Sequence, residues 1–221
     1  MIKAVIYDVD GTVLDTLSTI AYYGNKALEH FGFSSLPESN YKYYAGNGAK
    51  VLIERMLDAL GVSIEENFEK VFSYYNEIYN KAPLGLTKPF EGISELVATF
   101  KKMGIKQAVV SNKPDFATRG VMSACFTDEF DRVYGARDGV KLKPHPEALL
   151  SVLDELGVER SECLYVGDTS VDMDTGKNAG VKTIGVLWGF RDRSELEEHG
   201  ADYIVEHPVQ ILEIVNSINK K

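Results

Sequence analysis

The feature of this sequence that most constrains its fold is an alternation of short apolar segments with segments of helical periodicity. The apolar segments are rich in β-branched residues and predict strands at residues 2–8, 106–111, 132–135, 162–167, 183–187 and 203–205. Helices are expected near 92–103, 115–124, 146–156, 171–179 and 207–219. Because the strands are apolar throughout, both faces of the sheet must be covered. The sequence therefore predicts an α/β fold built on a doubly wound parallel sheet.

Residues 16–88 interrupt this alternation. They contain no convincing strand, and apolar residues recur there at helical spacing, first in 49–60 and again in 68–79. Eight of the 12 tyrosines lie in this segment, where we expect them to pack between helices, with a tyrosine-rich binding surface as the alternative. The pattern predicts a core domain of residues 1–15 and 89–221 and an inserted helical domain of residues 16–88. Linkers are expected near 15–18 and in the Pro- and Gly-containing segment 82–90.

Composition narrows the possible partners. The 221 residues carry a net charge of −9 without a basic run, so neither nucleic acid nor an anionic membrane is an expected partner. We expect a cytoplasmic protein, because no targeting segment or long apolar run is present and the two cysteines lack metal-binding spacing. An anionic substrate would have to be bound by a local metal, lysine or backbone N–H group. The oligomeric state, monomer or dimer, is not readable from the sequence.

Carboxylates gather at the ends of two predicted strands. Asp8 and Asp10 follow the first strand, and residues two apart in a strand face the same side, so their charges repel. Asp168 ends the strand at 162–167 and lies at the same sheet edge. Asp8 and Asp168 can supply oxygens to Mg²⁺, which would relieve the repulsion. The alternative for the first pair is an ordinary Asp- and Gly-containing turn.

Groups suited to phosphate follow other strands. Ser111 and Asn112 end the second strand, and Lys143 lies in a proline-flanked loop. A serine hydroxyl, the N–H groups of the next turn and a lysine can together hold phosphate oxygens. The alternatives are a helix cap for Ser111–Asn112 and a solvated loop charge for Lys143. Lys113 and Asp174 are interpreted as surface charges.

Four motifs in one order carry a resemblance to a known family. DVDGT (8–12), SN (111–112), KPHP (143–146) and GDTSVD (167–172) resemble the four motifs of haloacid dehalogenase-type hydrolases, and the helical insertion resembles that family's cap. Segments such as VVSNKP and KPHPEALL are similar to phosphoglycolate phosphatases and related pyrophosphatases. The resemblance implies a Rossmann-like α/β core with an all-helical cap domain after the first strand.

The resemblance also implies roles for the acids. Asp8 would be the nucleophile that forms an aspartyl-phosphate, and Asp10 the general acid and base. Lys143 would be a catalytic residue that also binds the phosphoryl group. Mg²⁺ would be bound by the Asp8 and Asp168 carboxylates and the Asp10 backbone carbonyl, with Asp172 nearby or binding through water.

Substrate contacts are expected from four further residues, which are Thr12, Asn47, Ser111 and Asn112. Thr12 would also orient Asp10. Gly46-Asn47-Gly48 would bring backbone and amide to a small substrate, open the following helix, or do both. The implied activity is Mg²⁺-dependent hydrolysis of a small phosphomonoester, with phosphoglycolate as first candidate. A pyrophosphatase and a β-phosphoglucomutase-like phosphomutase are the alternatives. A non-enzymatic phosphoacceptor module is disfavoured, because such modules are shorter and lack the second aspartate.

Overall fold

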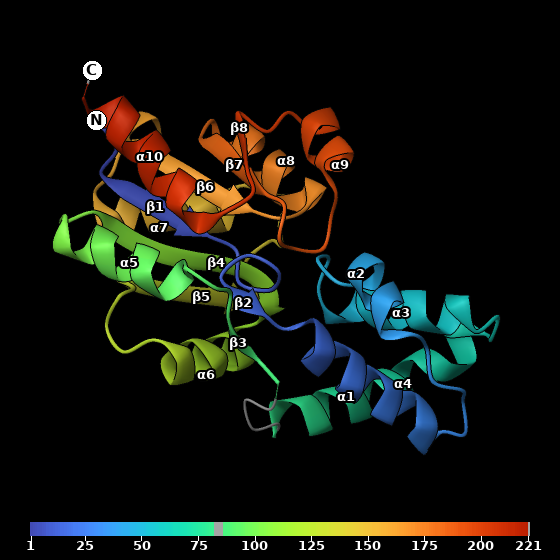
Figure 1. Cartoon of the computed structure of the whole chain (residues 1–221). Helices are drawn as coiled ribbons and strands as arrows, with labels where there is room; N and C mark the ends of the chain where they lie inside the picture. The colour runs from blue at the N-terminus through green and yellow to red at the C-terminus, as the bar shows by residue number, and fades with distance from the viewer. Residues whose placement is uncertain (82–85, 221) are drawn as a thin grey trace.

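The computed structural model describes residues 1–81 and 86–220, and its centre is a six-stranded parallel sheet (Figure 1). The strand order is β5-β4-β1-β6-β7-β8. The strands are β1 (Ala4–Tyr7), β4 (Lys106–Pro114), β5 (Arg132–Ala136), β6 (Cys163–Gly167), β7 (Lys182–Val186) and β8 (Tyr203–Val205). The predicted α/β fold is confirmed, and each strand overlaps the segment expected for it. The β1 strand lies between β4 and β6, where the winding of the chain reverses, which is the usual ligand-binding position in such sheets.

Helices cover both faces of the sheet, as the apolar strands require. Along β1, Val5 and Tyr7 face one apolar core while Ala4 and Ile6 face the other, and all four are fully buried. The first core is covered by α5 (Ile93–Lys102), α6 (Asp115–Cys125) and α10 (Pro208–Asn219). The second is covered by α7 (Glu147–Leu156) and α8 (Ser170–Ala179). A short helix that the sequence analysis missed, α9 (Arg193–Glu198), begins at Asp192, whose side chain accepts a hydrogen bond from Glu195 N.

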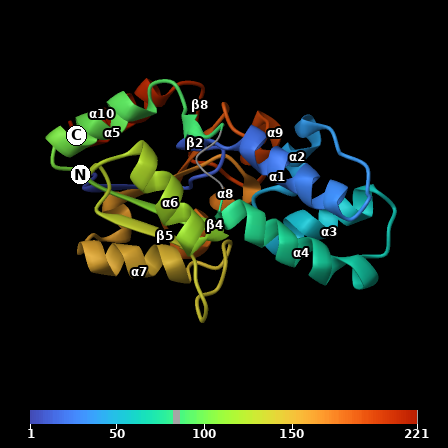
Figure 2. The same ribbon diagram turned by 90° about the horizontal axis from the view of Figure 1, so that it is seen from below.

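The segment after β1 forms a separate group of helices beside the sheet edge (Figures 1 and 2). It contains α1 (Leu17–His30), α2 (Tyr41–Tyr44), α3 (Ala49–Ala59) and α4 (Ile64–Asn80), with a 3-10 turn at Glu38–Asn40. These helices enclose their own apolar core, in which Tyr41, Tyr75 and Tyr79 are buried. These three tyrosines therefore pack between helices as expected, whereas Tyr22 and Tyr43 are exposed. We call residues 16–88 the helical insertion.

Two short antiparallel strands join the helical insertion to the sheet. They are β2 (Leu14–Asp15) and β3 (Lys88–Pro89), and Phe90 N also donates to Val13 O. The sequence analysis placed no strand here, because two residues are too few to show a period. The first part of the expected linker, residues 82–85, lies outside the described residues. Among the described helices, none has the length and apolarity needed to span a bilayer.

Candidate active site

Three buried carboxylates meet beyond the carboxyl ends of β1 and β6. Asp8, Asp168 and Asp172 each offer an oxygen within 4.8 Å of the other two. The pairing of Tyr7 with Val166 sets the register, and Asp8 N donates to Val166 O, so the residue that follows β1 lies beside the end of β6. Asp172 is added by the first turn of α8. The sheet register therefore brings together acids that are far apart in the sequence.

The carboxylates differ in how many partners they have. Asp168 accepts hydrogen bonds from Thr12 Oγ1 (3.0 Å) and Phe190 N (2.8 Å). Both Asp172 oxygens accept hydrogen bonds, from Lys143 Nζ (2.7 Å) and from the backbone and hydroxyl of Thr169, among others. The expectation that Thr12 orients Asp10 is wrong, because Thr12 Oγ1 is directed to Asp168 instead.

Asp8 is the least satisfied of the three acids. Its Oδ1 forms an ion pair with Lys143 Nζ at 2.9 Å, and no other described residue donates to it. Burial raises the pKa of Asp8 to about 6; the Lys143 ammonium opposes this shift, and the charges of Asp172 and Asp10 add to it. Burial and the neighbouring carboxylates likewise raise the pKa of Asp168 well above its usual range.

The cluster fits a divalent cation. Three carboxylates lie together, and the one ammonium group beside them, that of Lys143, pairs with only two, Asp8 and Asp172. Negative charge is therefore in excess in a buried place. An all-oxygen set of donors suits hard cations such as Mg²⁺ or Ca²⁺ better than zinc, whose protein sites usually include nitrogen or sulfur ligands. Asp10 does not contribute its carboxylate to this cluster.

Asn112 fixes the loop that carries Lys143. Its Oδ1 accepts from Lys143 N (2.8 Å), and its Nδ2 donates to Lys143 O (3.0 Å) and to Gly46 O (3.2 Å) in the helical insertion. The side chain of Lys143 is 2% exposed. Both polar ends of the Asn112 amide are thus hydrogen-bonded to protein groups, and these bonds hold the Lys143 loop in place.

Asp10 has a lysine partner of its own, which the sequence analysis missed. Lys113 Nζ donates to Asp10 Oδ1 (2.9 Å) and to the hydroxyl of Tyr79 on α4 (2.6 Å). The interpretation of Lys113 as a surface charge is wrong, since its side chain is 3% exposed. The strand period could have predicted the burial of Lys113. Because β4 continues to Pro114, Ser111 and Lys113 are two residues apart in one strand and their side chains lie on the same face of the sheet. Asp174, by contrast, lies at the surface beside His199.

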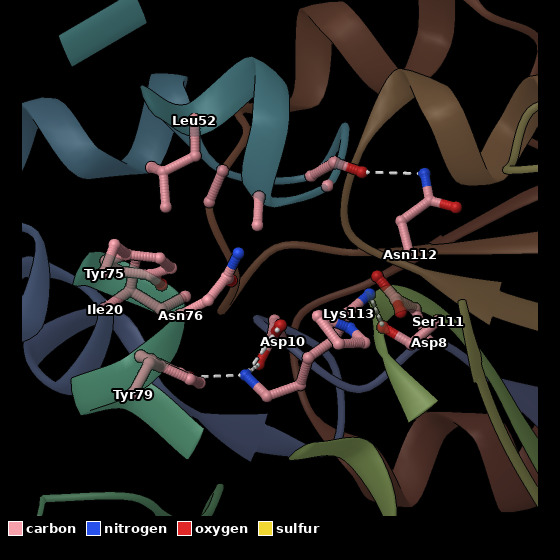
Figure 3. A pocket seen from close by; sticks show the side chains of 15 residues that line it. Asp8, Asp10, Ile20, Leu52, Tyr75, Asn76, Tyr79, Ser111, Asn112 and Lys113 are labelled. Carbon is pink, nitrogen blue, oxygen red and sulfur yellow. Dashed lines mark hydrogen bonds and ion pairs between the residues drawn. The ribbon is translucent and has the colours of Figure 1, made fainter. Parts of the chain in front are cut away.

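A cavity of about 50 Å³ lies between the strand ends and the helical insertion (Figure 3). Asp8, Asp10 and Ser111 line it from the sheet side, and Tyr79 and Asn76 from α4. The remaining lining residues are Ile20, Ala45, Gly46, Gly48, Ala49, Leu52, Tyr75, Asn112, Lys113 and Pro114. Asn76, Tyr75 and Tyr79 were not predicted as site residues, since helical periodicity does not show which face meets another domain.

The Gly46-Asn47-Gly48 loop approaches the sheet through its backbone. Gly48 has a φ of +88° and is the residue at which α3 begins, and a Cβ placed there would lie 3.4 Å from Asn112 O. Gly46 and Gly48 line the cavity, whereas the predicted Asn47 is not among its lining residues. The loop opens α3 and brings backbone to the cavity, but not the Asn47 amide, and its contact with a substrate stays a prediction.

Arg191 makes a further contact between the two parts of the molecule. Its guanidinium donates to Ala45 O (3.2 Å) and Lys42 O at the end of α2, and it pairs with Glu195 (3.1 Å). Glu195 in turn accepts from Ser170 N at the start of α8. The helical insertion is therefore held over the carboxylate cluster by backbone carbonyls of the α2 end.

The model of the family described as haloacid dehalogenase-like hydrolase matches residues 5–186. The chain belongs to this family. It is 31% identical, over 97% of its length and 95% of the relative, to the N-acetylmuramic acid 6-phosphate phosphatase of Pseudomonas aeruginosa. It is 30% identical to the phosphoglycolate phosphatase of Aquifex aeolicus, with 97% of each chain covered. A crystal structure of a candidate phosphoglycolate phosphatase from Lactobacillus delbrueckii superimposes with a TM-score of 0.90 at 31% identity, covering 96% of this chain and 98% of that one.

Membership of the haloacid dehalogenase-like hydrolases confirms the resemblance drawn from the four motifs. The protein is a hydrolase of the phosphoglycolate phosphatase-like group. The structure brings the four motifs together: Asp8 and Asp10 from the first, Ser111 from the second, Lys143 from the third and Asp168 from the fourth all lie around the cavity or its carboxylate cluster.

Proposed function

We propose that this protein is a Mg²⁺-dependent phosphatase that hydrolyses a small phosphomonoester, with phosphoglycolate as the first candidate, through an aspartyl-phosphate on Asp8. The observation that carries the proposal is Asp8 itself, a buried carboxylate at the wall of the cavity whose Oδ1 lies 2.9 Å from Lys143 Nζ. A carboxylate at the wall of a cavity, beside a lysine that can bind phosphoryl oxygens, is placed to attack phosphorus there.

The proposed reaction has two steps. In the first, an Asp8 oxygen attacks phosphorus, the bond from phosphorus to the leaving oxygen breaks, and the Asp10 carboxyl group gives its proton to that oxygen. In the second, Asp10 takes a proton from water, the water oxygen attacks phosphorus, and Asp8 is released with inorganic phosphate. Lys143 and the Ser111 hydroxyl would bind the phosphoryl oxygens in both steps.

The cation would be bound by the carboxylates of Asp8 and Asp168 and the backbone carbonyl of Asp10. When bound, it would neutralise charge on the phosphoryl oxygens. Both oxygens of Asp172 already accept hydrogen bonds, one from Lys143 and one from Thr169. This supports a position for Asp172 beside the cation, or a contact with it through water, rather than direct binding. Thr12 would act by orienting Asp168, through its 3.0 Å hydrogen bond.

The helical insertion, residues 16–88, would serve as a cap domain that closes over the substrate. A cavity of about 50 Å³ has room for a few water-sized groups, which favours a small ester over a bulky phosphorylated sugar. Asn76, and Asn47 if the loop moves, would contact the non-phosphate part of the substrate. Asn112 would act on the substrate only through the Lys143 loop.

Inorganic pyrophosphate is the second candidate substrate. A candidate pyrophosphatase from Clostridium perfringens is 33% identical over 99% of this chain and its own full length. A phosphomutase has less support, because a second phosphate calls for cations on the cap side and none of the cavity-lining residues from the helical insertion is basic. The cytoplasmic location and the absence of nucleic-acid and membrane partners stay predictions, as does the choice between monomer and dimer.

The proposal is tested by measuring phosphate release from a panel of phosphomonoesters and pyrophosphate, with Mg²⁺ and after chelation. We expect Mg²⁺-dependent release, fastest for a small ester such as phosphoglycolate. Turnover that persists after exhaustive chelation would contradict the proposed dependence on Mg²⁺. A panel without any turnover would contradict the proposed phosphatase activity. A preference for pyrophosphate would select the second candidate.

A further inference from the structure

The segment between β7 and α9, residues 187–192, lies against the Asp168 carboxylate. Phe190 N donates to Asp168 Oδ2 at 2.8 Å. The backbone at Gly189 comes so close that a Cβ there would lie 2.3 Å from Asp168 Cβ and 2.4 Å from Gly11 O. A side chain at Gly189 would therefore not fit between this segment and the turn after β1. We call residues 187–192 the β7–α9 loop.

The same loop also holds the second donor to Asp168. Asp168 Oδ1 accepts a hydrogen bond from Thr12 Oγ1 (3.0 Å), and the indole Nε1 of Trp188 donates to Thr12 O (2.9 Å). The Trp188 ring packs against the apolar core on one face of the sheet. Both Asp168 oxygens are thus oriented by groups that the β7–α9 loop supplies or holds in place.

The far end of the β7–α9 loop is anchored in the helical insertion. The Phe190 ring is 5% exposed and lies in the apolar core of the insertion, although Phe190 follows a strand of the sheet. The next residue, Arg191, donates to Ala45 O at the end of α2 (3.2 Å), where the loop and the insertion lie side by side (Figure 1). The insertion therefore holds the residue whose backbone N–H orients Asp168.

We infer that Phe190 and Trp188 are positioning residues of the cation site, which fix the orientation of the Asp168 carboxylate from two sides. The inference rests on the proposed function, since that proposal assigns Asp168 to Mg²⁺. Each Asp168 oxygen accepts one hydrogen bond from the described residues, so a second lone pair on each remains for a cation. A carboxylate that is already held in one orientation loses little freedom on binding and so binds more tightly.

The test measures the binding of Mg²⁺ alone by calorimetry, so its result does not depend on turnover. Phe190→Ala removes the ring from the core of the insertion, and we expect its Kd for Mg²⁺ to rise about tenfold, a loss typical when a group that orients a metal ligand is disturbed. Phe190→Leu keeps an apolar anchor and should restore a Kd close to that of the parent. Trp188→Phe keeps an aromatic ring without the N–H donor, and its Kd should rise at least about threefold.

Leu57→Ala is the matched control. Leu57 is fully buried in the same apolar core, but it belongs to α3 and does not line the cavity. We expect Leu57→Ala to lower the stability in urea, as Phe190→Ala does, and to leave the Kd for Mg²⁺ unchanged. An equal loss of affinity in Leu57→Ala, or parental affinity in Phe190→Ala, would overturn the inference and leave the proposed function intact.

The emission of Trp188 supplies a second measurement, because Trp188 is the only tryptophan of the chain. In the parent, Mg²⁺ should change this emission with the midpoint found by calorimetry. Constant emission during a titration in which calorimetry shows binding would overturn the inference alone. A parent that binds no Mg²⁺ would overturn both the inference and the metal dependence of the proposed function. A parent that binds Mg²⁺ as expected but hydrolyses no ester would overturn only the proposed phosphatase activity.

Discussion

Gly11 offers a sharp test of the carboxylate cluster, because its backbone leaves no room for a side chain. A Cβ placed on Gly11 would lie 2.1 Å from an oxygen of Asp168, where ordinary contact begins at 3.4 Å, a shortfall of about 1.3 Å. Asp168 cannot simply turn away, since Thr12 Oγ1 and Phe190 N hold its two oxygens. In Gly11→Ala we therefore expect the Asp168 carboxylate to be displaced by about 1 Å, a misplacement that costs on the order of 10²-fold in rate.

Gly32→Ala separates this displacement from backbone strain. Gly11 and Gly32 have similar φ values, +83° and +77°, but a Cβ on Gly32 would have no neighbour within 4 Å. Gly32→Ala should lose about 1–2 kcal/mol of unfolding free energy, the cost of a left-handed conformation with a side chain. Gly11→Ala should lose more, because its Cβ also displaces Asp168. Only Gly11→Ala should also lose affinity for the cation.

Three measurements decide the comparison: urea unfolding, Mg²⁺ titration by calorimetry, and phosphate release as a function of Mg²⁺ concentration. We expect Gly32→Ala to match the parent in the last two and Gly11→Ala to need at least about tenfold more Mg²⁺, in keeping with the loss typical for disturbed metal-site geometry. Identical Mg²⁺ affinity and turnover in the two variants would refute the argument that Asp168 belongs to the cation site.

The remaining predictions concern four residues. Asp8→Asn should abolish Mg²⁺-dependent turnover without lowering the thermal unfolding midpoint, because it removes a carboxylate whose burial is unfavourable; residual turnover would exclude Asp8 as the nucleophile. Asp10→Asn should slow turnover of an alkyl phosphate by more than about tenfold, and a smaller loss would count against its acid–base role. Asn112→Ala should lower the unfolding free energy measured in urea by about 2–4 kcal/mol, because the buried N–H and C=O of Lys143 lose their hydrogen-bond partners. A loss below about 1 kcal/mol would show that water replaces these partners. Arg191→Gln should raise KM with little change in kcat, because the closed position of the helical insertion loses its contact with the α2 end; an unchanged KM would show that Arg191 does not hold the insertion.

The sequence alone was sufficient for the fold and for the list of acids. Continuous apolar segments in alternation with helical ones force a covered parallel sheet, and a parallel sheet brings the residues after its strands to one edge. Asp8, Asp10 and Asp168 could therefore be predicted as neighbours from their places after strands. The order of the motifs then pointed to the family, which the comparison with known proteins confirms.

The partners of these residues depended on the tertiary structure. Lys113 reaches Asp10 across 103 residues and Tyr79 across 34, and no local pattern encodes which lysine will pair with which acid. Thr12 is close to Asp10 in sequence, yet the turn after β1 directs its hydroxyl to Asp168. Sequence spacing determines which face of a strand or helix a side chain takes, whereas the register of the sheet and the docking of the helical insertion decide what that side chain meets.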